Sequence, residues 1–100
     1  MAYFLVLQHR SGPEWEPGVP LREQSGFAAH GAFMDDLVDR GLIVLGGPLA
    51  DEHRVILVFD AESEEAVRDA LAPDPWIPSH LAVESIEPWT ILLYGRVSRG

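Results

Sequence analysis

The sequence contains no cysteine and no lysine, and both absences narrow what the chain can do. Without cysteine there is no disulfide framework, no thiol nucleophile and no thiolate metal site. All seven basic residues are arginine, against 16 acidic residues, so the formal net charge is −9. A chain this acidic, with no basic stripe, lacks the electrostatic footprint of a nucleic-acid-binding protein. Nucleic acid is therefore excluded as a partner.

Long hydrophobic runs are also missing. No apolar segment approaches the roughly 20 residues that a membrane-spanning helix needs. The apolar start MAYFLVL has no basic region in front of it, so no signal peptide is expected. A length of 100 residues with 47% hydrophobic residues suits one domain, residues 1–100, with a single core. We therefore expect a single-domain cytoplasmic protein without membrane association.

Hydrophobic patterning predicts strands and helices in the order β-α-β-β-α-β. The strands are expected at residues 2–9, 42–49, 55–60 and 81–87, with residues 89–94 extending the last strand or adding a short fifth. The helices are expected at residues 22–40 and after Ser63, which has the features of an N-cap. A loop rich in proline and glycine, residues 11–20, follows the first strand. This order indicates an α+β, ferredoxin-like antiparallel sheet with two helices on one face.

The other face of this sheet needs a cover as well. The strand segments YFLVL and VILVF are apolar on both sides, but two helices can cover only one face. A second copy of the chain is the simplest cover, so we expect a homodimer through the open sheet face. In the loop at residues 11–20, Trp15 is expected to be more than half buried, over a pocket mouth or the dimer edge.

One histidine stands out in the first predicted helix. At about 100° per residue, His30 falls on the same side as Phe27, Phe33 and Leu37, and Asp36 falls opposite. His30 thus points toward whatever the helix packs on. An imidazole suits proton transfer near neutral pH. The alternative is a core histidine that bonds a backbone carbonyl.

Three sequence features together resemble the YciI-like (YCII-related) family of the dimeric α+β barrel superfamily. They are the histidine in GFAAHGAFMDDLVDRG, the Gly-Pro in LIVLGGPL and the Asp-Pro in APDPW, spread from Ala2 to about Trp89. The resemblance implies a homodimer with a pocket between the first helix and the sheet of each subunit. It also implies a His–Asp active centre, carried here by His30 and Asp74. Family members often have arginine one turn before the histidine, where this chain has Phe27, with Arg22 further upstream.

The second strand ends in three residues that are candidates for substrate binding: Gly46, Gly47 and Pro48. Glycine lets a ligand approach the backbone, whose N–H groups can hold a developing oxyanion. The alternative is a strand-end bulge before the proline.

Aromatic residues are further candidates. Trp76 and Trp15 can wall a pocket for an aromatic ligand, or can simply cover the core, and Phe27 is a further candidate for substrate binding. Asp74 precedes a proline, so it also fits the N-cap of a short helix, a role compatible with orienting a histidine. The three residues His9, His30 and His80 lack the spacing of metal ligands, and we expect no metal or other cofactor.

The sequence and the resemblance favour a cofactor-free enzyme of the lyase or isomerase kind, acting on a small cyclic or enolisable molecule. A dehydrochlorinase is among the proteins of this type. His30 would be the general base or acid, and Asp74 would orient it. Two alternatives stay open: a non-catalytic small-molecule-binding or accessory module, and a purely structural dimer.

Overall fold

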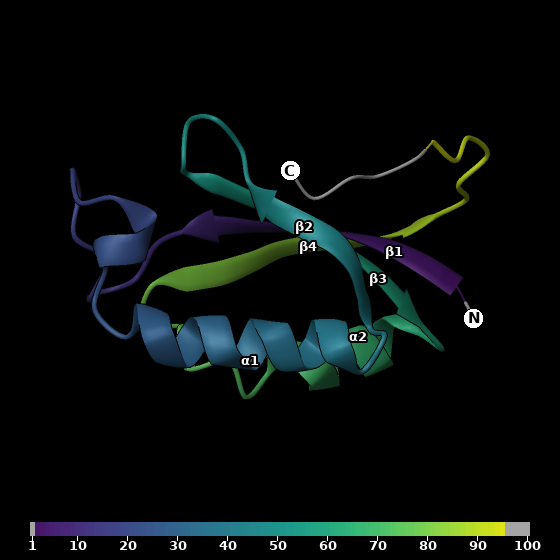
Figure 1. The fold of residues 1–100 in the computed structure, drawn as a ribbon, viewed down its shortest axis with the longest axis horizontal. Coiled ribbons are helices and arrows are strands. Elements are labelled where there is room, and N and C mark those ends of the chain that lie inside the picture. Colours follow the sequence, from purple (N-terminus) through teal and green to yellow (C-terminus); the bar gives the residue numbers. More distant parts are fainter. Residues whose placement is uncertain (1, 96–100) are drawn as a thin grey trace.

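The structure is a computed structural model that describes residues 2–95. Its strands are β1 (Ala2–Arg10), β2 (Ile43–Pro48), β3 (Arg54–Ala61) and β4 (Leu81–Trp89), and its helices are η1 (Leu21–Glu23), α1 (Phe27–Asp39) and α2 (Glu64–Leu71). The strands form one antiparallel sheet in the order β2-β3-β1-β4. Both α-helices lie on the same face of this sheet (Figure 1). The predicted α+β, ferredoxin-like fold is confirmed.

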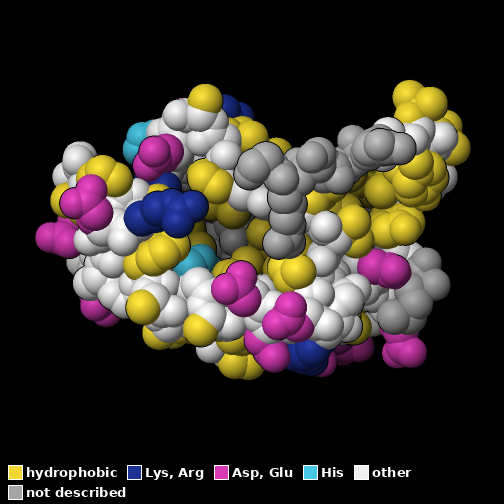
Figure 2. Space-filling view, viewed as in Figure 1, with side chains coloured by type: hydrophobic (Ala, Val, Ile, Leu, Met, Phe, Trp, Pro, Cys, Tyr) yellow, Lys and Arg dark blue, Asp and Glu magenta, His cyan; other side chains and the backbone are white. Residues whose placement is uncertain are grey.

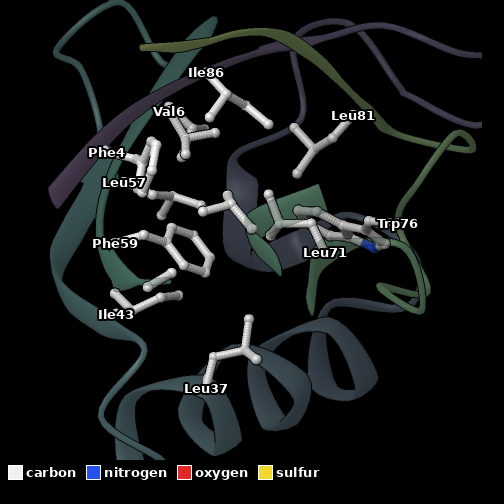
Figure 3. Packing of buried hydrophobic residues seen from close by; sticks show 13 residues of the cluster. Phe4, Val6, Leu37, Ile43, Leu57, Phe59, Leu71, Trp76, Leu81 and Ile86 are labelled. Atoms are coloured by element: carbon white, nitrogen blue, oxygen red, sulfur yellow. The ribbon is translucent and has the colours of Figure 1, made fainter. Parts of the chain in front are cut away.

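The core lies between the sheet and the two helices. In β1 every second side chain points toward the helices, and the register places Phe4 beside Phe59 and Val6 beside Leu57 of β3. These side chains are buried, and they lie in one layer with Leu37 of α1 (Figure 3). The alternation follows from the two-residue period of a strand. Because both α-helices lie on one face, no helix of residues 2–95 covers the second face of the sheet.

The expected helix at residues 22–40 is shorter than predicted. Only Leu21–Glu23 form a 3-10 helix before the chain opens, and α1 begins at Phe27. The interruption has two causes. The side-chain amide of the buried Gln24 bonds the backbone of Glu16 and Val19, holding the preceding loop instead of continuing a helix. Gly26 then takes a left-handed conformation, with φ 73°, which favours glycine.

The last strand is longer than the predicted segment at 81–87. It runs through Pro88 to Trp89. A proline is tolerated inside β4 because β4 is an edge strand, with one side free of ladder hydrogen bonds. Residues 90–95 form neither a continuation nor a fifth strand. Other local predictions are confirmed: β2 and β3 form a hairpin, and the Ser63 hydroxyl accepts a hydrogen bond from the N–H of Ala66.

The loop at residues 11–20 packs against the end of β1. Trp15 is more than half buried, and the Arg10 guanidinium lies 4.1 Å from the centre of its ring. Burial lowers the pKa of Arg10. The Glu52 carboxylate, 3.7 Å from the Arg10 guanidinium, acts in the opposite direction and raises this pKa. Trp15 and Arg10 line a cavity of their own with residues of the β2–β3 link. One alternative of the sequence prediction placed this loop over a pocket mouth, but no residue of 11–20 lines the cavity beside His30.

Candidate active site

His30 and Asp74 form a direct hydrogen bond. His30 is in the first turn of α1, Asp74 follows α2, and His30 Nδ1 lies 2.9 Å from Asp74 Oδ1. The His30 side chain is 12% exposed, whereas the Asp74 side chain is fully buried. The expected separation is therefore present, and Nδ1 bonds a carboxylate rather than a backbone carbonyl. A carboxylate accepts, so Nδ1 carries the proton and Nε2 of the neutral ring is left as the basic nitrogen.

The turn after α2 fixes the Asp74 carboxylate. Asp74 Oδ1 also accepts from the backbone N–H of Trp76 at 2.9 Å, and the Asp74 N–H donates to the carbonyl of Leu71. Asp74 thus caps its own turn and bonds His30 with the same oxygen, so the two roles considered for it coexist. Its other oxygen, Oδ2, is buried and bonds no described residue.

Trp76 supports the histidine from the side. The indole is almost completely buried and stacks on the His30 ring, with centres 4.1 Å apart and planes 7° from parallel. It also stacks on His80 at 4.8 Å, and its Nε1 donates to the carbonyl of Ser25 at 2.9 Å. A fixed indole on one side and a carboxylate at Nδ1 leave the His30 ring little freedom to turn.

A cavity of about 280 Å³ lies beside this pair, between α1 and the strands β2 and β3. His30 and Trp76 line it, as do the three predicted residues at the end of β2: Gly46, Gly47 and Pro48. The rest of the wall is mainly apolar: Leu21, Met34, Val38, Ile43, Val44, Leu45, Val55, Leu57 and Leu81, with Asp35 as its carboxylate. These apolar residues carry no motif, and only the fold assembles them.

Two predicted site residues lie outside this lining. Asp74 sits behind His30, where it can act only through the imidazole. Phe27 was predicted to bind substrate, but its ring packs 5.8 Å from Trp76 and does not line the cavity. The Arg22 guanidinium lies 5.9 Å from the centre of the Phe27 ring and does not line it either. Among the residues that the structure describes, no arginine therefore lines the cavity to receive an anionic group.

The two glycines of β2 differ in their surroundings. A Cβ on Gly46 would lie 2.6 Å from Leu57 Cδ2 and 2.8 Å from the carbonyl oxygen of Ile56. A Cβ on Gly47 would meet nothing within 4 Å. Gly46 is thus required by the packing of β2 on β3 beside the cavity, whereas Gly47 is free to face a ligand.

The histidines do not gather into a metal centre. Among residues 2–95 there is no group of three or more histidine, aspartate and glutamate side chains placed to hold an ion. His9 instead lies 3.9 Å from Glu84. In the same part of the chain, no helix is long and apolar enough to cross a membrane.

Comparison with known proteins supports the family resemblance of the sequence. No curated protein matches the chain. The YCII-related domain, however, matches residues 1–90, which include the entire sheet, both helices and the His30–Asp74 pair. The chain therefore belongs to the YCII-related family.

Proposed function

We propose that this protein is a cofactor-free lyase or isomerase that moves a proton on a small cyclic or enolisable molecule. The observation that carries this proposal is the 2.9 Å hydrogen bond between His30 and Asp74 at the wall of a mainly apolar cavity. A buried carboxylate that accepts from one imidazole nitrogen fixes the tautomer and makes the other nitrogen a directed base. It also stabilises the imidazolium that forms when that base takes a proton.

In the proposed reaction, His30 Nε2 removes a proton from a carbon next to a carbonyl group or a leaving group. The C–H electron pair moves into the adjoining bond, so a negative charge develops on the carbonyl oxygen or the leaving group departs. For an isomerase, His30 returns the proton to another carbon of the same molecule. For a lyase, the proton passes to the leaving group or to water. Asp74 holds its own charge throughout and acts as a positioning residue.

The cavity indicates the kind of molecule that would be bound. Its volume, about 280 Å³, lies at the small end of ligand sites and suits a single-ring compound. The walls formed by residues 2–95 are mainly apolar and hold no arginine, which favours an uncharged ligand over a di-anion. Gly46 and Gly47 near the end of β2 bring the backbone close to the ligand, as the proposed oxyanion contact requires.

We also propose that two copies of the chain associate through the sheet face opposite the helices. Val44 and Leu45 of β2 are 50% and 44% exposed, and Leu92 and Leu93, beyond β4, are 82% and 90% exposed. Hydrophobic side chains gather on the segment after β4 (Figure 2). A stable dimer buries about 800 Å² per partner. Light scattering at micromolar concentration is expected to give twice the chain mass, and a monomer would refute this assembly.

Association through this face would also affect the cavity, because Val44 and Leu45 line both it and the surface hollow beside the C-terminal segment. A double substitution of the exposed leucines, Leu92→Ser with Leu93→Ser, is expected to weaken the dimer without touching the His30–Asp74 pair. A cytoplasmic location stays a prediction from composition.

The experiment for the catalytic proposal is deuterium exchange followed by NMR. A panel of cyclic ketones and halogenated cyclic enols is first screened by thermal shift, and each stabilising compound is then incubated with protein in D₂O. The wild type is expected to exchange the activated C–H of a binder or to eliminate halide. General base catalysis contributes about 100-fold or more, so His30→Gln should lose at least that factor.

The matched control for that experiment is His53→Gln, which removes an exposed imidazole from the β2–β3 link. This variant is expected to keep the wild-type rate. A compound that binds at the cavity and exchanges at the same rate with His30→Gln would refute the enzyme. A compound that binds at the cavity but shows no protein-dependent exchange or elimination would instead support the alternative, a binding module that holds the ligand without turning it over.

A further inference from the structure

A second pair of side chains, a serine and a histidine, contacts Trp76 outside the site proposed above. Ser25 Oγ is 3.0 Å from His80 Nε2, although the two residues are 55 positions apart in the chain. Ser25 is exposed and immediately precedes Gly26 and α1, whereas His80 is buried, with 3% of its surface exposed. An exposed hydroxyl bonded to a buried imidazole is the arrangement in which a serine can act as a nucleophile.

The contacts around His80 are compatible with the tautomer that makes its Nε2 a base. The Ser79 hydroxyl donates its single hydrogen to the carbonyl of Pro75 at 3.2 Å, and it also lies 2.8 Å from His80 Nδ1. A Ser79 hydroxyl that donates to Pro75 can only accept from His80 Nδ1, so the tautomer used in this inference carries the ring proton on Nδ1. Nε2 is then a lone pair directed at Ser25, and it accepts the serine hydrogen.

Both members of the pair are held in place by Trp76. The indole stacks on the His80 ring at 4.8 Å, and its Nε1 donates to the Ser25 carbonyl at 2.9 Å. The Ser25 backbone and the His80 ring are thus fixed to the same buried side chain. Preorganisation of this kind lowers the entropic cost of bringing a nucleophile and its base together. A serine that was merely solvated at a helix start would need none of these contacts.

The start of α1 supplies a second element of such a site. The N-cap residue, Gly26, offers no side-chain cap to the first turn. Some N–H groups in the first turn of a helix have no intrahelical partner. These groups carry a partial positive charge and therefore stabilise a developing oxyanion. Because Ser25 directly precedes this turn, the oxyanion that forms on the acyl oxygen of an ester attacked by Ser25 Oγ lies near these groups.

From this geometry we infer that Ser25 is an acyl-accepting nucleophile with His80 as its general base, and that the pair hydrolyses small activated esters. Ser25 Oγ bonds to the acyl carbon while His80 Nε2 takes its proton. The bond from the acyl carbon to the leaving oxygen breaks, and the leaving oxygen receives that proton. Water then attacks the acyl-serine, His80 again accepting and returning a proton, and a carboxylic acid is released.

The exposure of Ser25 defines the substrate class. A surface nucleophile encloses little of its substrate, so it cannot strain or orient a poor leaving group. Aryl esters with a short acyl chain need the least assistance, because the phenolate leaves readily. This inference is independent of the lyase or isomerase reaction, which uses His30 and Asp74.

The deciding experiment uses p-nitrophenyl acetate as substrate and phenylmethylsulfonyl fluoride as a covalent probe. Peptide mass mapping after the probe reaction is expected to place the sulfonyl group on Ser25. Ser25→Ala should lose both the mark and the enzyme-dependent p-nitrophenol release. His80→Phe keeps a ring on Trp76 but removes the base, and should lower the labelling rate about 100-fold or more. Labelling that is absent, or that falls elsewhere in the wild type, would overturn the inference.

Two controls separate catalysis from structure. Any exposed imidazole hydrolyses this ester slowly, so His53→Gln measures that background and is expected to leave Ser25 labelling unchanged. Ser79→Ala removes the acceptor that holds the His80 tautomer and is expected to slow labelling, and Ser79→Thr, which keeps the hydroxyl, should restore it. If His80→Phe melts like the wild type and still labels at the wild-type rate, His80 is not the base and the inference fails. If His80→Phe does not fold, the Ser79 pair decides in its place: an equal labelling rate for alanine and threonine would refute it.

Discussion

The His30–Asp74 hydrogen bond should be measurable as a coupling energy. In a double-mutant cycle of His30→Ala and Asp74→Ala, each single variant removes the bond and leaves one partner buried without it. A hydrogen bond to a charged group contributes about 1.5–3 kcal/mol. Both side chains are almost completely enclosed, at 12% and 0% exposed, so solvent screening takes little from this value. We expect a coupling energy of about 1.5–3 kcal/mol.

The single-variant cost of Asp74→Ala should be larger than the coupling. It also frees the N–H of Trp76, which Asp74 Oδ1 caps at 2.9 Å, and losing a cap costs about 1 kcal/mol. The sum, about 2.5–4 kcal/mol, is a large fraction of the 5–15 kcal/mol that stabilises an ordinary domain. The cap is lost in the single and in the double variant alike, so it cancels from the coupling energy.

The assay is urea unfolding at one fixed protein concentration, with the midpoint read at a constant m-value. A matched control cycle is Glu64→Ala with Arg68→Ala on α2. There an ion pair of 3.1 Å joins side chains that are about half exposed, and we expect only about 0.3–0.5 kcal/mol. A His30–Asp74 coupling no larger than this control would contradict the assignment of a charge-assisted bond, and with it the basis of the proposed base.

Two further outcomes follow from the β2–β3 hairpin. Gly46→Ala forces a Cβ against Leu57 and should lower the free energy of unfolding by about 1–3 kcal/mol, whereas Gly47→Ala should change it by less than about 0.5 kcal/mol; equal urea midpoints for the two would refute this reading of the packing. The backbone N–H of His53 holds the pKa of the Asp51 carboxyl below its usual value, so the stability that Asp51 contributes is present near neutral pH and is lost as the pH falls through its folded-state pKa. An NMR titration in which Asp51 protonates at or above the ordinary pKa of an aspartate would contradict this.

Much of the fold could be predicted because its determinants are local. The two-residue alternation of β1 and the apolar run of β3 specify central strands, and Ser63 specifies where α2 begins. The start of α1 could not be predicted in the same way. It depends on Gln24, whose side chain bonds the loop residue eight positions earlier. The helical periodicity of residues 22–40 contains no information about that contact.

In the candidate site, too, the local features could be predicted from the sequence and the long-range contacts could not. Helical phase alone placed His30 on an inward face, but its pairing with Asp74 came from the family resemblance, because the two residues lie 44 positions apart. His80 was considered only as a metal ligand. Its bond to Ser25 depends on the path of the turn between α2 and β4, which side-chain spacing does not encode. The Asp-Pro-Trp and Ser-His residues of that turn were the available signal, since binding and catalytic residues lie disproportionately on loops.

Trp76 explains why two different histidine pairs lie so close together in so small a protein. Its backbone N–H fixes the Asp74 carboxylate, and its indole stacks on both His30 and His80 while donating to Ser25. One buried residue thus sets the geometry of both proposed bases, His30 at the cavity and the buried His80 beside the exposed Ser25. A substitution of Trp76 must therefore disturb both centres and cannot distinguish them. His30→Gln and His80→Phe each remove one base and leave the indole in place, so only such a pair of variants can assign an observed activity to one centre or the other.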